Sequence, residues 1–353
     1  MVNIVNRYLF KTISINILFV LVILSFLFAL MTLISESDKL KPDYGWADVL
    51  LFILYTTPKR MADIAPMAVL IGTLTSLGSL ASNNELSVLR ASGYSIAQIS
   101  LNVFAVGLVL MAALLSMGEF IIPLSEQKAM QIKNPRQLTQ IKEGLWLKNK
   151  NLIIKIGKVN PDKSIKDIKI YEKNNQQISR EYTAKTAYEI SKNEWVLQDV
   201  KILTYQQQAI KKEFKKTLKM SDLLKTNIFE VLILKADSLS IGKLLTYINY
   251  LKTNKLKYEP YQLALWQKIF SPLALFIMQA LALPFIFGMQ RASNAGIRIV
   301  IGSIIGISYS MLSYLISNLG LLYGIMPLIS VVIPIMLFAT AAFIGNKKYV
   351  FNS

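Results

Sequence analysis

The sequence predicts a membrane protein with six transmembrane helices in two groups of three and an inserted periplasmic all-β, jelly-roll-like domain between the groups. Three observations predict this fold class. Hydrophobic residues make up 53% of the chain, and the mean hydropathy is +0.43. Long uncharged runs recur near both ends, and a long basic segment separates them. Charged residues make up 17% of the chain, so a large part of it must lie outside lipid.

The first group of apolar runs occupies residues 1–120. Ile13–Ile34 has 22 residues without a charge, which is long enough to cross the hydrocarbon core as a helix. Ile64–Ala81 and Ile96–Met117 are the second and third expected spans. Small residues in the second span favour close helix contacts. Val49–Thr57 is too short to span and is followed by a proline, so the sequence predicts a separate interfacial helix there.

A short polar stretch, residues 83–94, joins the second and third spans. Glu85 and Arg90 would lie in the first and last turns of a short helix, the order that the helix dipole favours. Gly93 is suited to end such a helix. Three residues at i, i+3 and i+4 would share one helix face: Leu86, Leu89 and Arg90. This pattern fits a solvated connection and a contact site for a soluble partner equally well.

Residues 121–262 have a different composition. They hold 27 Lys and Arg residues against 14 Asp and Glu residues, so about +13 of the chain's net charge of +18 lies here. Short β-prone runs between turn residues fill the first part. The expected strands are Leu152–Ile156, Ile168–Tyr171, Ile178–Thr183, Thr186–Ile190, Trp195–Val200 and Ile202–Tyr205. They predict a sandwich or jelly-roll domain, and a helical apolar pattern over 241–251 leads back to the membrane.

Three further spans are expected in residues 263–353, namely Ile269–Met289, Ile299–Leu319 and Leu321–Ile344. Prolines inside them are tolerable because neighbouring helices can satisfy the freed backbone groups. With the N-terminus inside, the short cytoplasmic loops hold seven Lys and Arg residues against four on the other side. Positive loops favour the cytoplasm, so the sequence predicts cytoplasmic termini, a cytoplasmic 83–94 stretch and an external or periplasmic β domain.

Composition also excludes several chemistries. The chain has no Cys and no His, which removes thiol nucleophiles, disulfides, Cys/His zinc sites and histidine-based triads. No GxxxxGK[ST] motif occurs, so the chain does not hydrolyse nucleotides itself. The apolar runs lack the buried carboxylates that proton-coupled carriers use. The positive net charge favours anionic partners, either lipid headgroups or a polyanionic substrate.

Short characteristic stretches run almost from end to end of the sequence. They are Asn6-Arg7-Tyr8, Pro58-Lys59, Glu85-Leu86, Ala91-Ser92-Gly93, Gly118-Glu119 with Pro123, Gly144-Leu145-Trp146, Leu239-Ser240-Ile241, Leu265–Leu273, Phe285–Gly288 and Gly296-Ile297-Arg298. No single stretch is diagnostic. Their order, together with the layout of three spans, a β domain and three spans, resembles the LptF/LptG permease family of the lipopolysaccharide export ABC transporter. The chain is more similar to the G-type subunit.

The resemblance implies a permease subunit that is not itself an enzyme and binds no cofactor. ATP and Mg would be used by a partner, a cytoplasmic ATPase dimer. The other implied partners are an F-type sister permease, a single-span bitopic subunit with a periplasmic β-jelly-roll domain, and lipopolysaccharide; nucleic acid is not expected. Lipopolysaccharide would be extracted from the bacterial inner membrane and passed to a periplasmic β-jelly-roll bridge.

The resemblance also implies site residues. Residues 83–94 would form the coupling helix to the ATPase, and its contact residues would be Glu85, Leu86, Leu89, Arg90 and Gly93. The alternative role of Glu85 is to cap its own helix. The residues expected to contact lipopolysaccharide phosphates are Lys39, Lys41, Lys59 and Lys133, with simple solvation or snorkelling as the alternative. Arg298 would anchor the fifth span at the cytoplasmic face.

Other function classes stay open at this point. A mechanotransmission module, or another ABC-type membrane subunit without lipid translocation, would act on periplasmic partners, but such modules usually carry four spans. A lipid-modifying enzyme would need converging acid, base or nucleophile groups, which the charge-free spans and the missing His disfavour. The F-type sister role shares the same layout.

Overall fold

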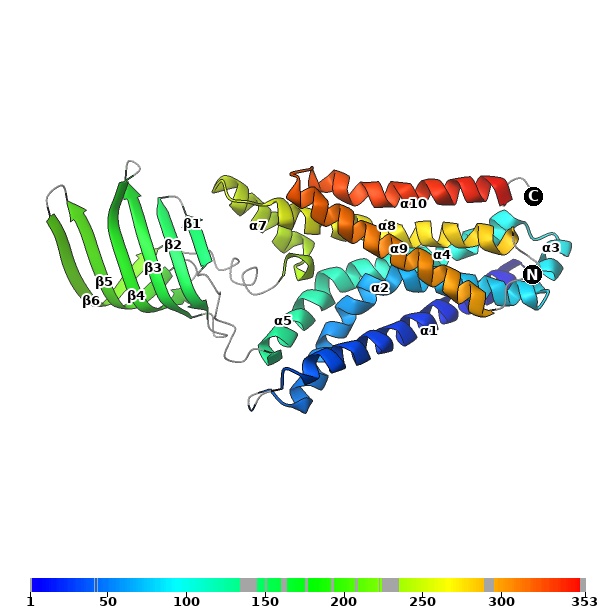
Figure 1. Cartoon of the computed structure of the whole chain (residues 1–353), viewed down its shortest axis with the longest axis horizontal. Coiled ribbons are helices and arrows are strands. Elements are labelled where there is room, and N and C mark those ends of the chain that lie inside the picture. Colours follow the sequence, from blue (N-terminus) through cyan, green and yellow to red (C-terminus); the bar gives the residue numbers. More distant parts are fainter. Residues whose placement is uncertain are drawn as a thin grey trace.

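The computed structural model describes residues 2–40, 42, 44–133, 145–149, 151–159, 164–174, 177–191, 194–206, 209–221, 223, 235–288 and 295–349. The described chain forms a bundle of long helices and, beyond one end of the bundle, a six-stranded sheet (Figure 1). The short helix α3 lies at the other end of the bundle, close to the start of the first helix and the end of the last (Figure 1).

Within the described ranges, six helices are long and apolar enough to cross a membrane. They are α1 (Val2–Ser37), α2 (Trp46–Ser82), the continuous helix Ile96–Lys133, α8 (Glu259–Phe287), α9 (Ala295–Leu322) and α10 (Pro327–Tyr349). The sheet is inserted after the third of them, so the expected division into two groups of three spans is confirmed. The protein is a multi-pass membrane protein.

Helix α2 is longer than the sequence suggested. It runs without a break through Pro58 and Pro66, so the prediction of a separate interfacial helix over Val49–Thr57 is wrong. An internal proline costs about 3 kcal/mol in an exposed helix. Here the turns before Pro58 are packed, with Val49 and Phe52 buried, and packing against neighbouring helices offsets that cost.

Helix α2 also forms the centre of the bundle. In its most apolar window 78% of the residues are buried, compared with 6% in α1 and 17% in α9. Close approach explains the contacts on both sides of α2. A Cβ atom at Gly72 would lie 2.5 Å from the Ile17 Cα atom of α1, and one at Gly306 of α9 would lie 2.6 Å from the Met67 Cγ atom. The expected small-residue contacts of the second span are therefore present.

The third span changes helix type near the end that lies toward the sheet. α4 (Ile96–Ser116) passes into a π-helical turn, η1 (Met117–Ile121), and then into α5 (Ile122–Lys133). The sequence predicted that this span ends at Met117 and that the β domain begins at residue 121. The helix continues instead because α5 has its own buried face, which packs on α2.

The last two helices are joined by a short turn. α9 ends at Leu322 and α10 begins at Pro327, whereas the sequence placed the start of the last span at Leu321. Gly324 has a φ of 70°, which glycine adopts without strain. The apolar run continues across this turn, so hydropathy by itself does not reveal it.

The inserted domain is a single antiparallel sheet in the described residues. Its strands are β1 (Leu145–Asn149), β2 (Leu152–Val159), β3 (Ile165–Asn174), β4 (Gln177–Ser191), β5 (Glu194–Gln206) and β6 (Ala209–Ser221). Each strand pairs with the next one in sequence. The inserted all-β domain is confirmed, and the strand order among the described residues is a simple meander.

Strands β4 and β5 each combine two strands that the sequence predicted as separate. Their pairing passes from Thr183 opposite Lys201 to Thr186 opposite Gln198, and Asp199 within this step has a φ of 53°. This local irregularity interrupts the alternation of apolar residues along each strand. The sequence pattern therefore predicts two short strands where the hydrogen-bonded ladder forms one long strand. β6 was not predicted because five lysines dominate it, as is common in edge strands.

Helix α7 (Ile241–Thr253) connects the sheet to the bundle. Ser240 caps it by accepting a 3.4 Å hydrogen bond from the Lys243 amide. Its apolar face includes the fully buried Leu244, which belongs to the same core as strand residues such as Ile154 and the α8 residue Leu265. The helix predicted over 241–251 is thus confirmed, and it forms the packed link between the two parts of the protein.

Candidate functional site

The first candidate site is the short helix α3 (Glu85–Ala91), which joins α2 to α4. Asn84 precedes it with a φ of 60° and makes no side-chain capping bond. Glu85 Oε2 instead accepts a 2.7 Å hydrogen bond from the Tyr8 hydroxyl group of α1. The carboxylate therefore ties α3 to the first membrane helix.

The remaining residues predicted for this helix differ in burial. Leu86 is only 3% exposed and belongs to the core of the bundle, and Leu89 packs against the same core. Arg90 and Gly93 are exposed. The helix over Glu85–Ala91 places Arg90 on the same face as the two leucines by its spacing, but the leucines pack on the bundle and the charged side chain stays in solvent. Gly93 has a φ of 90° and lies just past the helix end, as predicted.

The second candidate site is at the sheet end of the bundle and centres on Glu36 of α1. This carboxylate is 3% exposed. Its Oε1 atom lies 2.9 Å from Lys39 Nζ and 2.6 Å from Lys133 Nζ. The Tyr44 hydroxyl group donates a 3.4 Å hydrogen bond to Oε2. Burial, followed by the Glu36 charge, raises the pKa of Tyr44 to about 12, so this phenol remains a donor at neutral pH.

The structure thus brings together two of the four lysines predicted to contact phosphate. Lys133 also lies 4.6 Å from the centre of the Phe52 ring, within the range of a cation–π contact. Two ammonium groups on one carboxylate leave a net positive charge at this site. Lys41 lies outside the described residues.

Lys59, the remaining predicted lysine, pairs with a residue that follows the β strands in the sequence. Its Nζ atom lies 2.5 Å from Oδ2 of Asp237, which is in the short 3₁₀ helix η3 (Ala236–Ser238). Partial burial on its own would raise the pKa of Asp237, but the adjacent Lys59 ammonium group outweighs burial and holds the pKa below its ordinary value. The pair links α2 to the segment that leads into α7.

Two further polar contacts hold the same segment. Glu119 Oε2, in the π-helical turn, accepts a 2.8 Å hydrogen bond from the Ile241 amide at the start of α7. The Lys268 ammonium group of α8 donates to the Leu239 carbonyl. Residues 237–241 are therefore attached to three membrane helices. We call this set of contacts, including the Lys59–Asp237 pair, the α7 tether.

Sequence reasoning missed the carboxylates at this end. Glu36, Asp237 and Glu119 each find their partners far along the chain, so no local pattern marks them. The one local signal is the spacing of Glu36 and Lys39, which predicts an ion pair on a helix. Among the described residues, no group of three or more Asp and Glu side chains is arranged to hold a metal ion.

Arg298, predicted to anchor the fifth span, lies at the α3 end of the bundle. It follows closely on the start of α9, and its guanidinium group packs against the Cα of Gly78 in α2, where a Cβ atom would collide with it. The side chain is half-buried. Arg298 therefore contributes to the contact between α9 and α2 near the membrane surface.

Comparison with known proteins completes the description of the chain. The family described as "Lipopolysaccharide export system permease LptF/LptG" matches residues 7–348. The lipopolysaccharide export system permease protein LptG of Escherichia coli (strain K12) is 31% identical over 343 residues, which cover 94% of both chains. LptG of Haemophilus influenzae is 30% identical over 349 residues, which cover 96% of each. Because the match spans nearly the whole sequence and the described fold supplies six spans and the inserted sheet, the chain belongs to the LptF/LptG family of lipopolysaccharide export system permeases.

Proposed function

We propose that this chain is the G-type permease subunit of an ATP-driven exporter, which extracts lipopolysaccharide from the inner membrane and passes it to a periplasmic β-jelly-roll bridge. The observation that carries the proposal is the end-to-end similarity to LptG proteins, 31% identity over 94% of both chains. In this arrangement the termini and α3 are cytoplasmic and the sheet is periplasmic. The excess of short-loop Lys and Arg residues on the α3 side supports that orientation.

Helix α3 is proposed to receive force from a cytoplasmic ATPase dimer. Its contact surface would consist of Glu85, Arg90 and the exposed Val88, while Leu86 and Leu89 fix it to the bundle. A helix that is bonded to α1 through Tyr8 and packed on the core moves with the bundle rather than independently of it. This rigid attachment suits a coupling helix, because movement of the ATPase then displaces membrane helices.

The lysines at the sheet end are proposed to bind the phosphates of lipopolysaccharide. Their ammonium groups are partly accessible, with exposed side-chain fractions of 51% for Lys39, 28% for Lys133 and 16% for Lys59. Glu36 and Asp237 hold them in place, and a phosphate would exchange with these carboxylates or share the lysines with them. Lys41 would belong to the same group.

The outward faces of α1 and α9 are proposed to contact the F-type sister permease and the single-span bitopic subunit. Both helices carry large exposed apolar residues, including Phe26 and Met31 in α1 and Met311 and Tyr314 in α9. Lipid covers such faces readily, but two of them flanking the same central helix also suit a pair of permeases enclosing a lipid cavity.

A reconstituted exporter tests the coupling role. We expect Glu85→Ala to insert normally into membranes but to reduce co-purification of the ATPase and ATP-driven lipopolysaccharide release. Glu213→Ala on the edge strand β6 is the matched control, because it removes a carboxylate that is also half-buried and lies on a strand far from α3 (Figure 1). Normal release by the Glu85→Ala complex would refute the coupling role. Purification without an ATPase or a sister six-span protein would favour a different ABC-type subunit.

A photo-crosslinking experiment tests the phosphate role separately. A photo-reactive residue at the exposed position Arg60 keeps Lys59 intact beside it and should capture lipopolysaccharide. Asp237→Asn should increase the capture, because Lys59 then loses its competing carboxylate. A photo-reactive residue at Leu108, on the exposed face of α4, serves as the control. Equal capture at both positions, or no response to Asp237→Asn, would contradict the phosphate role of Lys59.

A further inference from the structure

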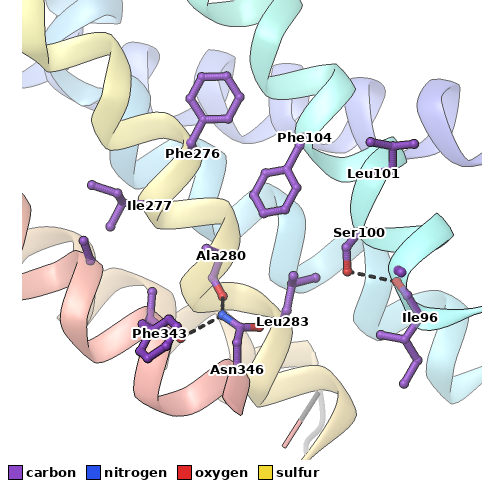
Figure 2. Close-up of a pocket in the computed structure, with 13 residues that line it drawn as sticks. Ile96, Ser100, Leu101, Phe104, Phe276, Ile277, Ala280, Leu283, Phe343 and Asn346 are labelled. Carbon is purple, nitrogen blue, oxygen red and sulfur yellow. Dashed lines mark hydrogen bonds between the residues drawn. The ribbon is translucent and has the colours of Figure 1, made fainter. Parts of the chain in front are cut away.

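A cavity lies between α4, α8 and α10 in the half of the bundle that carries α3. Its volume is about 650 Å³, within the range of small-molecule sites. Almost all of its lining is apolar. Ile96, Phe104, Phe276 and Leu283 face it from α4 and α8, and Phe343 faces it from α10 (Figure 2). A site of this size and lining accepts hydrocarbon rather than a polar substrate.

The cavity has a direction. Ile96 is the first residue of α4 and Asn346 lies in the last turn of α10, so both mark the α3 end. Phe104 and Phe276 close the deep end, with ring centres 6.3 Å apart. Phe104 lies eight positions after Ile96 in α4, which corresponds to about 12 Å along the helix axis. A single alkyl chain entering from the membrane surface would fit along this axis.

Asn346 supplies the main polar group near the surface end. Its Nδ2 atom donates to the carbonyl oxygens of Ala280 and Ala342, both at 2.8 Å (Figure 2). Because both acceptors are carbonyls, the orientation of the amide is fixed. The residue is only 7% exposed, and its Oδ1 atom is buried and accepts no hydrogen bond from the described part of the chain. This atom has almost no accessible surface, so a ligand in the cavity does not reach it, and Asn346 holds α10 against α8 rather than binding the ligand.

Two positive charges lie next to the surface end of the cavity in sequence. Lys347 and Lys348 follow Asn346 directly in the last turn of α10, and both are exposed. Cations at the level of lipid headgroups attract anionic lipids. The ligand that satisfies both the apolar lining and the adjacent lysines therefore has an alkyl chain and a negative charge.

We propose that this cavity binds an acyl chain of an anionic phospholipid, taken from the membrane leaflet at the α3 end. The acyl chain occupies the apolar cavity toward Phe104, and the phosphate lies beside Lys347. This site is separate from the lysines at the sheet end, and it does not depend on the proposed export function.

The location of the site gives it a further role. Ile96 follows Tyr94 and Ser95, which connect α3 to α4, and Tyr94 is buried in the bundle core. A lipid in the cavity contacts the first turn of α4 on one side and α10 on the other. Its presence would fix the position of the α3–α4 connection relative to the rest of the bundle.

Photo-labelling of the purified full-length complex in nanodiscs tests the proposal. The probes are phosphatidylglycerol and phosphatidylethanolamine that carry a diazirine at the end of one acyl chain. We expect the glycerol lipid to label peptides around Phe104 and Phe276 more strongly than the ethanolamine lipid does. Ala97→Phe, which fills the cavity from its exposed rim, should abolish this labelling. Leu108→Phe, on the same helix outside the cavity, should leave it unchanged.

A charge variant provides the second measurement. Replacing both lysines in the last turn of α10, Lys347→Gln with Lys348→Gln, should make the two lipids label the protein equally while the protein remains folded. Equal labelling by both lipids in the unmodified protein would overturn the proposal, as would labelling that persists in Ala97→Phe. Labelling that occurs in the isolated subunit but not in the assembled complex would also overturn it, because a protein partner would then cover the cavity.

Discussion

The Lys59–Asp237 pair is the contact of the α7 tether whose removal is easiest to interpret. The two side chains are 16% and 50% exposed, and their atoms lie 2.5 Å apart. Fully exposed pairs contribute about 0.2–1 kcal/mol, and removing one partner of a buried pair costs about 3–5 kcal/mol. This pair lies between these limits. We therefore expect Lys59→Ala to weaken the attachment of η3 and α7 by about 1–2 kcal/mol.

Hydrogen–deuterium exchange of the purified protein measures this attachment locally. About 1.4 kcal/mol corresponds to a tenfold change in an equilibrium, so amides of residues 238–246 should exchange about tenfold faster in Lys59→Ala. Asp237→Asn should have a similar effect. The double charge reversal, Lys59→Asp with Asp237→Lys, should restore slow exchange because it re-forms the pair. Amides in β3, on the far side of α7, provide the internal control.

The pH dependence follows from the lowered pKa of Asp237. A carboxyl group with a lowered folded-state pKa contributes stability above its unfolded pKa, with an ordinary value of 3.8. This contribution is lost as the pH falls through the lower folded value. The effect of Asp237→Asn on exchange should therefore stay constant around neutral pH and shrink only in acid. Unchanged exchange in Lys59→Ala, or failure of the charge reversal to restore it, would refute this account of the tether.

Three other substitutions test separate parts of the structure. Tyr8→Phe removes only the hydrogen bond to Glu85. ATPase binding should weaken by about 1 kcal/mol, so the amount of ATPase that co-purifies should fall roughly fivefold. An unchanged yield would contradict the role of this bond. Gly72→Ala places a Cβ atom 2.5 Å from the Ile17 backbone and should cost about 1–3 kcal/mol in detergent thermal stability, whereas Gly296→Ala, which has open space, should be neutral. Trp195→Ala should cost about 3–5 kcal/mol and loosen the sheet in limited proteolysis without affecting membrane insertion, because this side chain is 1% exposed in the sheet core.

Much of the fold is encoded in local patterns. Six runs of low charge predicted the six spans, because a hydrocarbon solvent requires apolar residues throughout a helix. The limits of the helices were less predictable. α2 continues through Pro58 because its neighbours pack against it, and the third span continues past Glu119 for the same reason. These outcomes depend on contacts that hydropathy does not describe.

The candidate sites follow the same division. The position of α3, its C-terminal Gly93 and the lysines at the sheet end of the bundle could all be read from the sequence. The partners of those residues could not. Glu36 and Lys133 are 97 positions apart, and Lys59 and Asp237 are 178 positions apart. The first pair meets because the third span runs back to the end of α1, and the second meets because the inserted domain returns the chain to the bundle.

The π-helical turn at Met117–Ile121 has a consequence for the whole third span. One inserted residue rotates everything after it by about 100° around the helix axis. α4 accordingly packs on α8 and α1, while α5 packs on α2. The two halves of a single membrane helix thereby recognise different neighbours. Deleting one residue from this turn would restore a uniform helix and swing the buried Glu126 away from its present surroundings. The wider turn changes which face of the span each neighbour meets. One helix can therefore contact helices that precede the inserted sheet in the sequence and helices that follow it.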